Sequence, residues 1–272
     1  MSDQAERAAH FLALHHGESP LLLPNPWDRG SARLLASLGF QALATTSSGF
    51  AATLGRLDGS VSRGEAVAHA AEIVAATELP VTVDLESGFA DDPAGVARTF
   101  ELIRDAGVAG ASIEDYSGSE DAPIYGIDQA AERVAAAAEV AHAGPARMVL
   151  TARSENYLHG VEDLDDTIAR LRAYQEAGAD VLYAPGVSDL EAIRQMVDSV
   201  DRPVNVLARP GLPPVAELAA VGVARVSVGG AFAFAAFAAV VDAAQELRCE
   251  GTYTFLKAAG AGAQSARAAF GD

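Results

Sequence analysis

The chain has 272 residues, of which 50% are hydrophobic, so it can bury one large core or two small ones. Its 19 basic and 37 acidic residues give a formal net charge of −18 at pH 7. This balance argues against binding to nucleic acid or to an anionic membrane, because both reward clustered Lys and Arg. An anionic substrate would need a local positive centre, either a metal ion or a well-placed Arg.

The numbers and positions of Cys, Lys and His argue against several kinds of active site. The one Cys, Cys249, has no disulfide partner within the chain, and the polar N-terminus shows no signal peptide, so we expect a cytoplasmic protein. The one Lys, Lys257, lies in the C-terminal tail, which disfavours a Schiff-base aldolase or a pyridoxal enzyme. Among the His residues only His159 follows a predicted strand end, so an imidazole-rich zinc site is not expected.

After a leading helix at 4–16, short β-like runs alternate with Ala-rich helical stretches. The predicted strands are 21–25, 42–47, 80–86, 110–115, 148–154, 181–185, 203–207 and 225–229. The predicted helices are 28–38, 62–77, 93–106, 128–142, 161–177, 188–199, 213–220 and 231–248. Eight strand–helix units predict an α/β fold, a (β/α)8 TIM-type barrel. A doubly wound sheet is disfavoured, because no Gly-x-Gly-x-x-Gly follows the first strand.

No linker or low-complexity stretch divides the chain, so we predict a single barrel domain over 1–272, with a partly mobile Ala/Gly-rich tail at 250–272. The apolar run 226–241 contains Gly229-Gly230 and reads as a strand followed by a buried helix, not as a membrane span. The last helix, from 231, is apolar on nearly all sides, whereas a surface helix of a barrel needs one polar face toward solvent. Either a second subunit or the tail of the same chain must cover it.

Acidic side chains gather at the predicted strand ends, where the active sites of such barrels lie. Asp84 and Glu86 share one face of the third strand, Glu114 ends the fourth, and Asp58 follows the second. Four acids at one mouth repel one another unless a cation offsets them. All-oxygen ligation favours Mg²⁺ or Mn²⁺, with Asp84 as the direct ligand and the other acids holding the waters of the metal. The alternative is that these acids cap helices or pair with Arg at the rim.

Several residues at the same strand ends are suited to binding an anion. Arg153 faces inward on the fifth strand and either binds a substrate carboxylate or pairs with Glu155 or another acid of the mouth. The turn formed by Thr46, Ser47, Ser48 and Gly49 offers backbone N–H groups that can hold a carboxylate. Trp27 is either a pocket wall or core packing, and Asn205 lies on the seventh strand. This set favours a small 2-oxo or 2-hydroxy acid as the substrate.

Five motifs, in this order and spacing, carry a resemblance to a known family. They are Trp27-Asp28 with Ser31-Ala32-Arg33-Leu34, Thr46-Ser47-Ser48-Gly49 running into Leu57-Asp58-Gly59, Asp84-Leu85-Glu86-Ser87-Gly88-Phe89, Ile113-Glu114-Asp115, and Ala152-Arg153-Ser154-Glu155. Over roughly residues 20–230 the chain resembles the isocitrate lyase/phosphoenolpyruvate mutase superfamily. The resemblance implies a Mg²⁺ site on Asp84 with Asp58, Glu86 and Glu114 around it, and carboxylate binding by 46–48 and Arg153. It also implies a homotetramer, a dimer of dimers in which the last helix swaps between subunits.

The loop after the fourth strand departs from the family pattern. Isocitrate and methylisocitrate lyases carry Lys-Lys/Arg-Cys-Gly-His there, whereas residues 116–126 of this chain contain no Cys, Lys or His. The Lys and Asn that phosphoenolpyruvate mutase places in this loop are also missing. The chain therefore resembles the less specialised branch, which includes oxaloacetate decarboxylase-like and 2-oxo-acid-cleaving enzymes.

Three hypotheses follow from these residues. The first is a Mg²⁺-dependent carbon–carbon lyase or decarboxylase that acts on a small 2-oxo or 2-hydroxy (di)carboxylic acid through a metal-stabilised enolate. Its catalytic residues would be Asp58, Glu114, Arg153 and Tyr116, with Tyr125 or a metal-bound water as other candidates for the proton donor. The second is a phosphonate C–P enzyme, against which the anionic loop 117–121 argues. The third is a non-catalytic barrel that binds 2-oxo acids.

Overall fold

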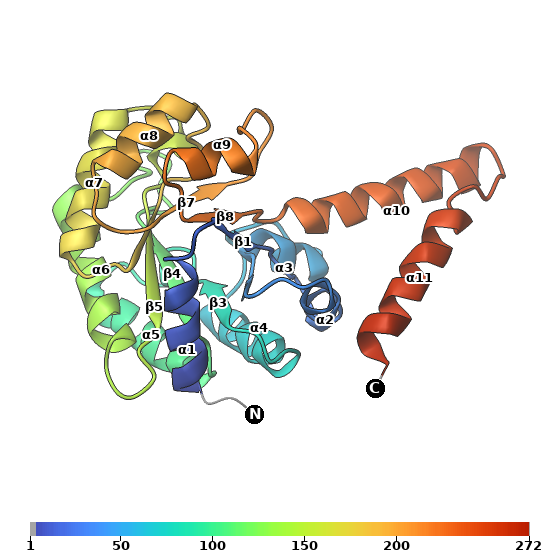
Figure 1. The fold of residues 1–272 in the computed structure, drawn as a ribbon, viewed down its shortest axis with the longest axis horizontal. Coiled ribbons are helices and arrows are strands. Elements are labelled where there is room, and N and C mark those ends of the chain that lie inside the picture. Colours follow the sequence, from blue (N-terminus) through green and yellow to red (C-terminus); the bar gives the residue numbers. More distant parts are fainter. Residues whose placement is uncertain (1–3, 272) are drawn as a thin grey trace.

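The computed structural model describes residues 4–271, which form a barrel of parallel strands surrounded by helices (Figure 1). The strands are β1 (Leu21–Leu23), β2 (Leu43–Ala44), β3 (Val81–Asp84), β4 (Gly110–Glu114), β5 (Val149–Arg153), β6 (Val181–Tyr183), β7 (Val204–Leu207) and β8 (Arg225–Ser227). They form an 8-stranded sheet in the order β1-β8-β7-β6-β5-β4-β3-β2, with parallel pairing throughout. This confirms the predicted (β/α)8 fold.

Helices follow the strands in the predicted alternation, and six of them begin at a residue whose side chain caps the helix. They are α1 (Gln4–Leu14), α2 (Arg29–Ser37), α3 (Ser47–Thr53), α4 (Arg63–Ala75), α5 (Pro93–Asp105), α6 (Ile127–Ala141), the 3-10 helix η1 (Asn156–His159), α7 (Leu164–Glu176), α8 (Leu190–Asp198), α9 (Val215–Ala220), α10 (Ala231–Cys249) and α11 (Leu256–Phe270). In α2 and α4, Asp28 and Ser62 form capping boxes with the third helical residue. Asp92, Asp163 and Asp189 cap α5, α7 and α8 in the simpler way, by accepting one N–H each.

Asn25 closes the barrel between its first and last strands. β1 and β2 are joined by the Ala44 amide, which donates to the Pro24 carbonyl at 3.0 Å. The Asn25 side chain donates to the Thr45 carbonyl at 2.8 Å and accepts from the amides of Val228 and Gly229 at 3.0 and 2.9 Å. One amide side chain thus ties the carboxyl ends of β1, β2 and β8 together, at the edge where barrel active sites lie.

Two apolar layers hold the barrel and leave its carboxyl end for polar groups. The larger layer lies between strands and helices and includes Val83, Leu85 and Ile113, all at most 2% exposed. The smaller fills the amino end inside the barrel, where Phe11 of α1 packs among inward side chains such as Leu21. Hydrocarbon thus fills much of the amino end of the barrel, where Arg225, in register with Leu21, is a buried exception, and most polar inward residues lie toward the carboxyl end.

The C-terminal region contains a helix beyond those predicted. In the tail at 250–272, whose partial mobility stays a prediction, the described part contains α11, which lies against α2 and places Phe270 beneath the Arg33 guanidinium, 5.8 Å from the ring centroid. Ala-rich sequence favours helix, and the cation–π contact adds to the packing of α11 on α2. α10 extends away from the barrel and α11 turns back from it (Figure 1).

The apolar surface of α10 is not covered within residues 4–271. Phe234 and Phe237 are 50% and 41% exposed, and Val240 is 64% exposed. Of the two predicted ways to cover this helix, the tail of the same chain does not do so. No helix among the described residues is long and apolar enough to cross a membrane.

Candidate active site

A cavity of about 230 Å³ opens at the carboxyl end of the barrel, and every strand or the loop after it contributes to the wall. Its volume equals that of roughly eight water molecules in the liquid, which suits a small organic acid. Among the predicted site residues, those that line it are Thr46, Ser47, Ser48, Asp58, Asp84, Arg153 and Asn205. Strands on opposite sides of the barrel thus bring together residues far apart in the sequence.

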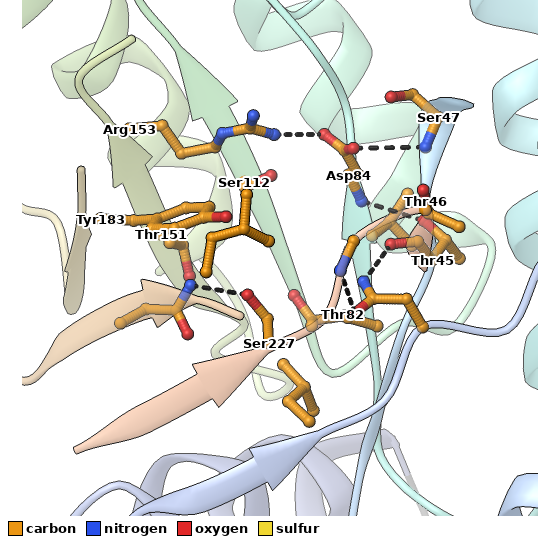
Figure 2. Close-up of a pocket in the computed structure, with 18 of the residues that line it drawn as sticks. Thr45, Thr46, Ser47, Thr82, Asp84, Ser112, Thr151, Arg153, Tyr183 and Ser227 are labelled. Atoms are coloured by element: carbon orange, nitrogen blue, oxygen red, sulfur yellow. Dashed lines mark hydrogen bonds and ion pairs between the residues drawn. The ribbon is translucent and has the colours of Figure 1, made fainter. Parts of the chain in front are cut away.

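Arg153 is the centre of the charged group at this mouth. Its Nη1 donates to Asp84 Oδ1 at 2.8 Å, across the cavity from β5 to β3 (Figure 2). Its Nη2 lies 3.2 Å from Glu114 Oε2, and its Nε donates to Glu155 Oε1 at 2.8 Å. The two readings of Arg153 were a substrate contact and a partner for the mouth acids, and the structure shows the second arrangement. One cation faces three carboxylates, so the group keeps an excess of negative charge.

Burial and this crowding set the ionisation of the group. Burial works against the charge of Arg153, but Glu155, Glu114 and Asp84 outweigh it and raise the pKa of the guanidinium. Burial also raises the pKa of Glu114 well above its ordinary value, which the attraction to Arg153 only partly offsets. Burial, with smaller contributions from Asp84 and Asp58, raises the pKa of Glu86 to about 7. Carboxyl groups of this kind are found where a cation or a proton is bound.

Asp84 is the last residue of β3 and lies between two cavities. Its Oδ2 accepts the Ser47 amide at 3.2 Å, and its own amide donates to Thr45 Oγ1 at 3.0 Å (Figure 2). A second, water-sized cavity beside the first is lined by both Asp84 and Glu86. Glu86 lies beyond the end of the strand in a tight turn, with a φ of 48°. The alternation that predicted a shared strand face ends at Asp84, and the turn brings Glu86 near it instead.

The acidic residues fit a hard divalent cation. Residues 4–271 hold no ready cluster of three His, Cys, Asp or Glu side chains that could hold a metal ion. Mg²⁺ does not require such a cluster, since it keeps several waters and takes only one or two carboxylates. Oxygen donors of Asp84, Glu86 and Asp58 lie around the two adjoining cavities, and two of these groups have raised pKa values because desolvation disfavours their charge. This is the donor set expected for Mg²⁺ or Mn²⁺.

Trp27 and Gly49 were predicted to contact substrate, but neither is among the residues that line the cavity. A Cβ on Gly49 would lie 2.6 Å from Thr46 Cγ2, 3.1 Å from Trp27 Cβ and 3.3 Å from Ala233 Cβ. Only Gly fits at this crossing of α3 with the start of α10. The structure therefore gives these residues a packing role, and their contact with substrate stays a prediction.

The tyrosines of the loop after β4 contact partners outside the charged group. Tyr116 stacks on the imidazole of His159 with ring centroids 4.0 Å apart. The Tyr125 hydroxyl donates to Asp91 at 2.6 Å. Neither tyrosine lines the cavity, although Leu158, next to His159, does. Asp115 faces away from the mouth, accepts from Tyr174 and Arg170, and holds the amide of Glu155 at 2.8 Å.

Comparison with known proteins places this site in a family. The family model described as phosphoenolpyruvate phosphomutase matches residues 11–248. The chain belongs to the phosphoenolpyruvate phosphomutase family. It is thereby a member of the isocitrate lyase/phosphoenolpyruvate mutase superfamily, as its motifs predicted.

Several relatives show how broad the chemistry of this family is. A solved structure of a candidate lyase/mutase from Burkholderia cenocepacia J2315 is 53% identical, with a TM-score of 0.92 over 94% of this chain and 92% of that one. The structure of 2,3-dimethylmalate lyase, a PEP mutase/isocitrate lyase superfamily member, is 29% identical, with a TM-score of 0.82 over 93% and 90%. The oxaloacetate decarboxylase of Chromohalobacter salexigens is 31% identical over 88% of this chain and 84% of its own length.

In this member of the phosphomutase family, three residues of the cavity wall were not predicted from the sequence. Tyr183, Arg225 and Ser227 line the cavity, and Arg225 was not considered because it starts β8 instead of ending it. The signal was nonetheless present, since Arg225 and Ser227 occupy alternate positions of a strand whose middle residue, Val226, belongs to the outer core. The same alternation had identified Arg153.

Proposed function

We propose that the protein is a Mg²⁺-dependent carbon–carbon lyase or decarboxylase acting on a small 2-oxo or 2-hydroxy (di)carboxylic acid. Family membership supports lyase or mutase activity in general. The observation that carries the narrower proposal is Arg153, held at 2.8 Å from Asp84 and 3.2 Å from Glu114 at the mouth of a small polar cavity. A cation beside acids that exceed it in charge suits a substrate anion together with a metal ion.

Each of the site residues has its own role in the proposed reaction. Asp84 would hold Mg²⁺ directly, with Glu86, Asp58 and Glu114 around its waters, and the ion when bound supplies Lewis-acid stabilisation of an enolate. The Arg153 guanidinium and the turn at 46–48 orient a substrate carboxylate. Burial raises the pKa of Glu114 well above its ordinary value, and this carboxyl group, 3.2 Å from Arg153, is the proposed carrier of a proton within the mouth. Tyr116, stacked on His159, is the proposed proton donor from the loop above.

The phosphonate C–P reaction is the alternative suggested by the family description. No contact in the described residues favours it. The loop that would meet the phosphoryl group contains exposed Glu120 and Asp121 and no Lys or Arg. Acidic side chains there would repel a phosphoryl dianion.

Purified protein with Mg²⁺ should be offered oxaloacetate, 2-methylisocitrate, isocitrate, 4-hydroxy-2-oxo acids and phosphonopyruvate, with and without EDTA. Release of pyruvate or glyoxylate that EDTA abolishes is the result expected from the proposal. Turnover of phosphonopyruvate alone would instead identify a C–P enzyme. Binding of 2-oxo acids without turnover of any compound would identify a binding barrel.

We also infer that α10 and α11 pack against further copies of the chain in a homotetramer. The support is the apolar surface of α10, where Phe232, Phe234, Phe237, Val240 and Val241 are each 39% to 64% exposed. An exposed apolar surface of this kind is costly in water and marks an interaction site. The acidic charge of −18 makes another copy a better partner for this surface than nucleic acid.

A further inference from the structure

A second arginine lies below Arg153, inside the barrel. Arg225 is 3% exposed and lines the cavity. Its Nη2 donates to Thr151 Oγ1 at 3.1 Å, and its Nη1 lies 3.1 Å from Nε2 of His15, the residue that follows α1. Since Thr151 precedes Arg153 by two residues on β5, Arg225 contacts this strand one inward position deeper, a rise of about 7 Å along the strand.

Arg225 lacks a countercharge within residues 4–271. None of the ion pairs in this part of the chain includes it, and its Nε has no hydrogen-bond partner there. His15 does not compensate, because burial and the nearby guanidinium lower its pKa to about 3 and keep it neutral. Burial lowers the pKa of Arg225 to about 10, which leaves it charged at neutral pH. An unpaired buried guanidinium is costly unless an anion meets it.

The side chains around this cation are neutral and polar. Asn205, its neighbour in register on β7, is 1% exposed and lines the same cavity. Its Nδ2 donates to Ser227 Oγ at 3.0 Å, while its Oδ1 has no partner in the described chain. Rotating the amide by half a turn would let Ser227 donate to Oδ1 and free the two Nδ2 hydrogens for an anion.

We propose that Arg225, with Asn205 and Thr151 beside it, forms a carboxylate subsite at the floor of the cavity, distinct from the charged group at its mouth. The proposal rests on the proposed function, because it assigns the substrate class as dicarboxylic: one carboxylate lies at Arg153 and the other at Arg225. The rise of about 7 Å between the two levels matches the length of a short dicarboxylate. A small free oxyanion beside a monocarboxylic substrate would meet the same chemistry.

The test is a binding comparison that does not depend on turnover. Succinate and butyrate have chains of equal length and differ in the second carboxylate, and both are titrated into metal-free protein by calorimetry. Loss of a charge-assisted contact in a buried site is worth about tenfold to a hundredfold in affinity. Wild type is therefore expected to bind succinate at least about tenfold more tightly, and Arg225→Gln to bind the two about equally. Arg172→Gln, at an exposed arginine on α7, is the matched control and should keep the preference.

Adding formate distinguishes the two possible ligands of the subsite, which are the second carboxylate of a substrate and a small free oxyanion. If formate raises the melting temperature of wild type but not of Arg225→Gln, while succinate shows no preference, the subsite takes a free anion. The proposal is overturned if wild type shows neither response. It is also overturned if Arg225→Gln keeps the succinate preference unchanged. Since Arg225→Gln removes a buried donor and can fail to fold, Asn205→Ala gives a second variant and should lower the preference several-fold. A preference for succinate without turnover of any tested acid would refute the proposed function and leave the subsite standing.

Discussion

Replacing Glu86 with Gln is expected to remove a pH-dependent loss of stability from the metal-free protein. Folding raises the pKa of this carboxyl from 4.5 to about 7, mainly by burial and then by Asp84 and Asp58. A carboxyl with a raised pKa favours the folded state while it is protonated. Its contribution is fully present below pH 4.5 and is lost as the pH rises through about 7.

The size of this effect follows from the pKa. The difference between 4.5 and about 7 corresponds to at most about 3 kcal/mol in the free energy of unfolding. Because Glu86 is only half-buried, solvent screens part of the interaction, and about 2 kcal/mol is expected. Glu86→Gln cannot ionise, so at pH 8 it should be more stable than wild type by this amount.

Urea unfolding of EDTA-treated protein at pH 5, 6, 7 and 8 measures this difference. Glu132→Gln, at an exposed position of α6, is the matched control and should follow wild type at each pH. Mg²⁺ should diminish the loss in wild type, because a bound cation offsets the charge of the ionised carboxyl. Parallel curves for wild type and Glu86→Gln, or a variant that is less stable at pH 8, would refute this account of the acidic mouth.

Three further outcomes are expected. Arg153→Met leaves Asp84, Glu114 and Glu155 without their cation, so it should cost roughly 3 kcal/mol in the free energy of unfolding near neutral pH and abolish turnover. Unchanged stability would contradict the ion-pair geometry. Gly49→Ala places a methyl 2.6 Å from Thr46 Cγ2 and should lower stability by about 1–3 kcal/mol in thermal unfolding, whereas an unchanged melting temperature would show that the crossing is loose. Phe237→Glu should reduce the molar mass measured by light scattering below that of a tetramer, and a wild-type mass would mean that α10 lies outside the subunit contact.

The strand pattern predicted those parts of the site that regular structure positions. Asp84 and Arg153 lie on β3 and β5, where alternation decides which side chains face inward, and they meet at 2.8 Å. Glu86 could not be placed in this way, because its left-handed backbone breaks the alternation after one residue. Its proximity to Asp84 comes from a turn that sequence periodicity does not describe.

Other features depend on packing between distant segments. The need for Gly at position 49 arises from α10, far away in the sequence, and no local pattern in 46–49 distinguishes packing from carboxylate binding. The tail at 250–272 was predicted to be partly mobile from its Ala/Gly-rich composition, which does not reveal the contact that α11 makes with α2. Arg225 was not predicted as a site residue, because it is the first residue of β8 and site residues are expected at the carboxyl ends of the strands.

The most direct test of the central claim is Mg²⁺ binding by calorimetry to wild type and to Asp84→Ala, with turnover of the best 2-oxo or 2-hydroxy acid followed on the same samples. The account predicts that wild type binds Mg²⁺ and releases product only when the metal is present. Asp84→Ala should lose both properties while keeping its fold by circular dichroism. An Asp84→Ala protein that keeps both Mg²⁺ binding and activity would contradict the assignment of Asp84 as the metal anchor.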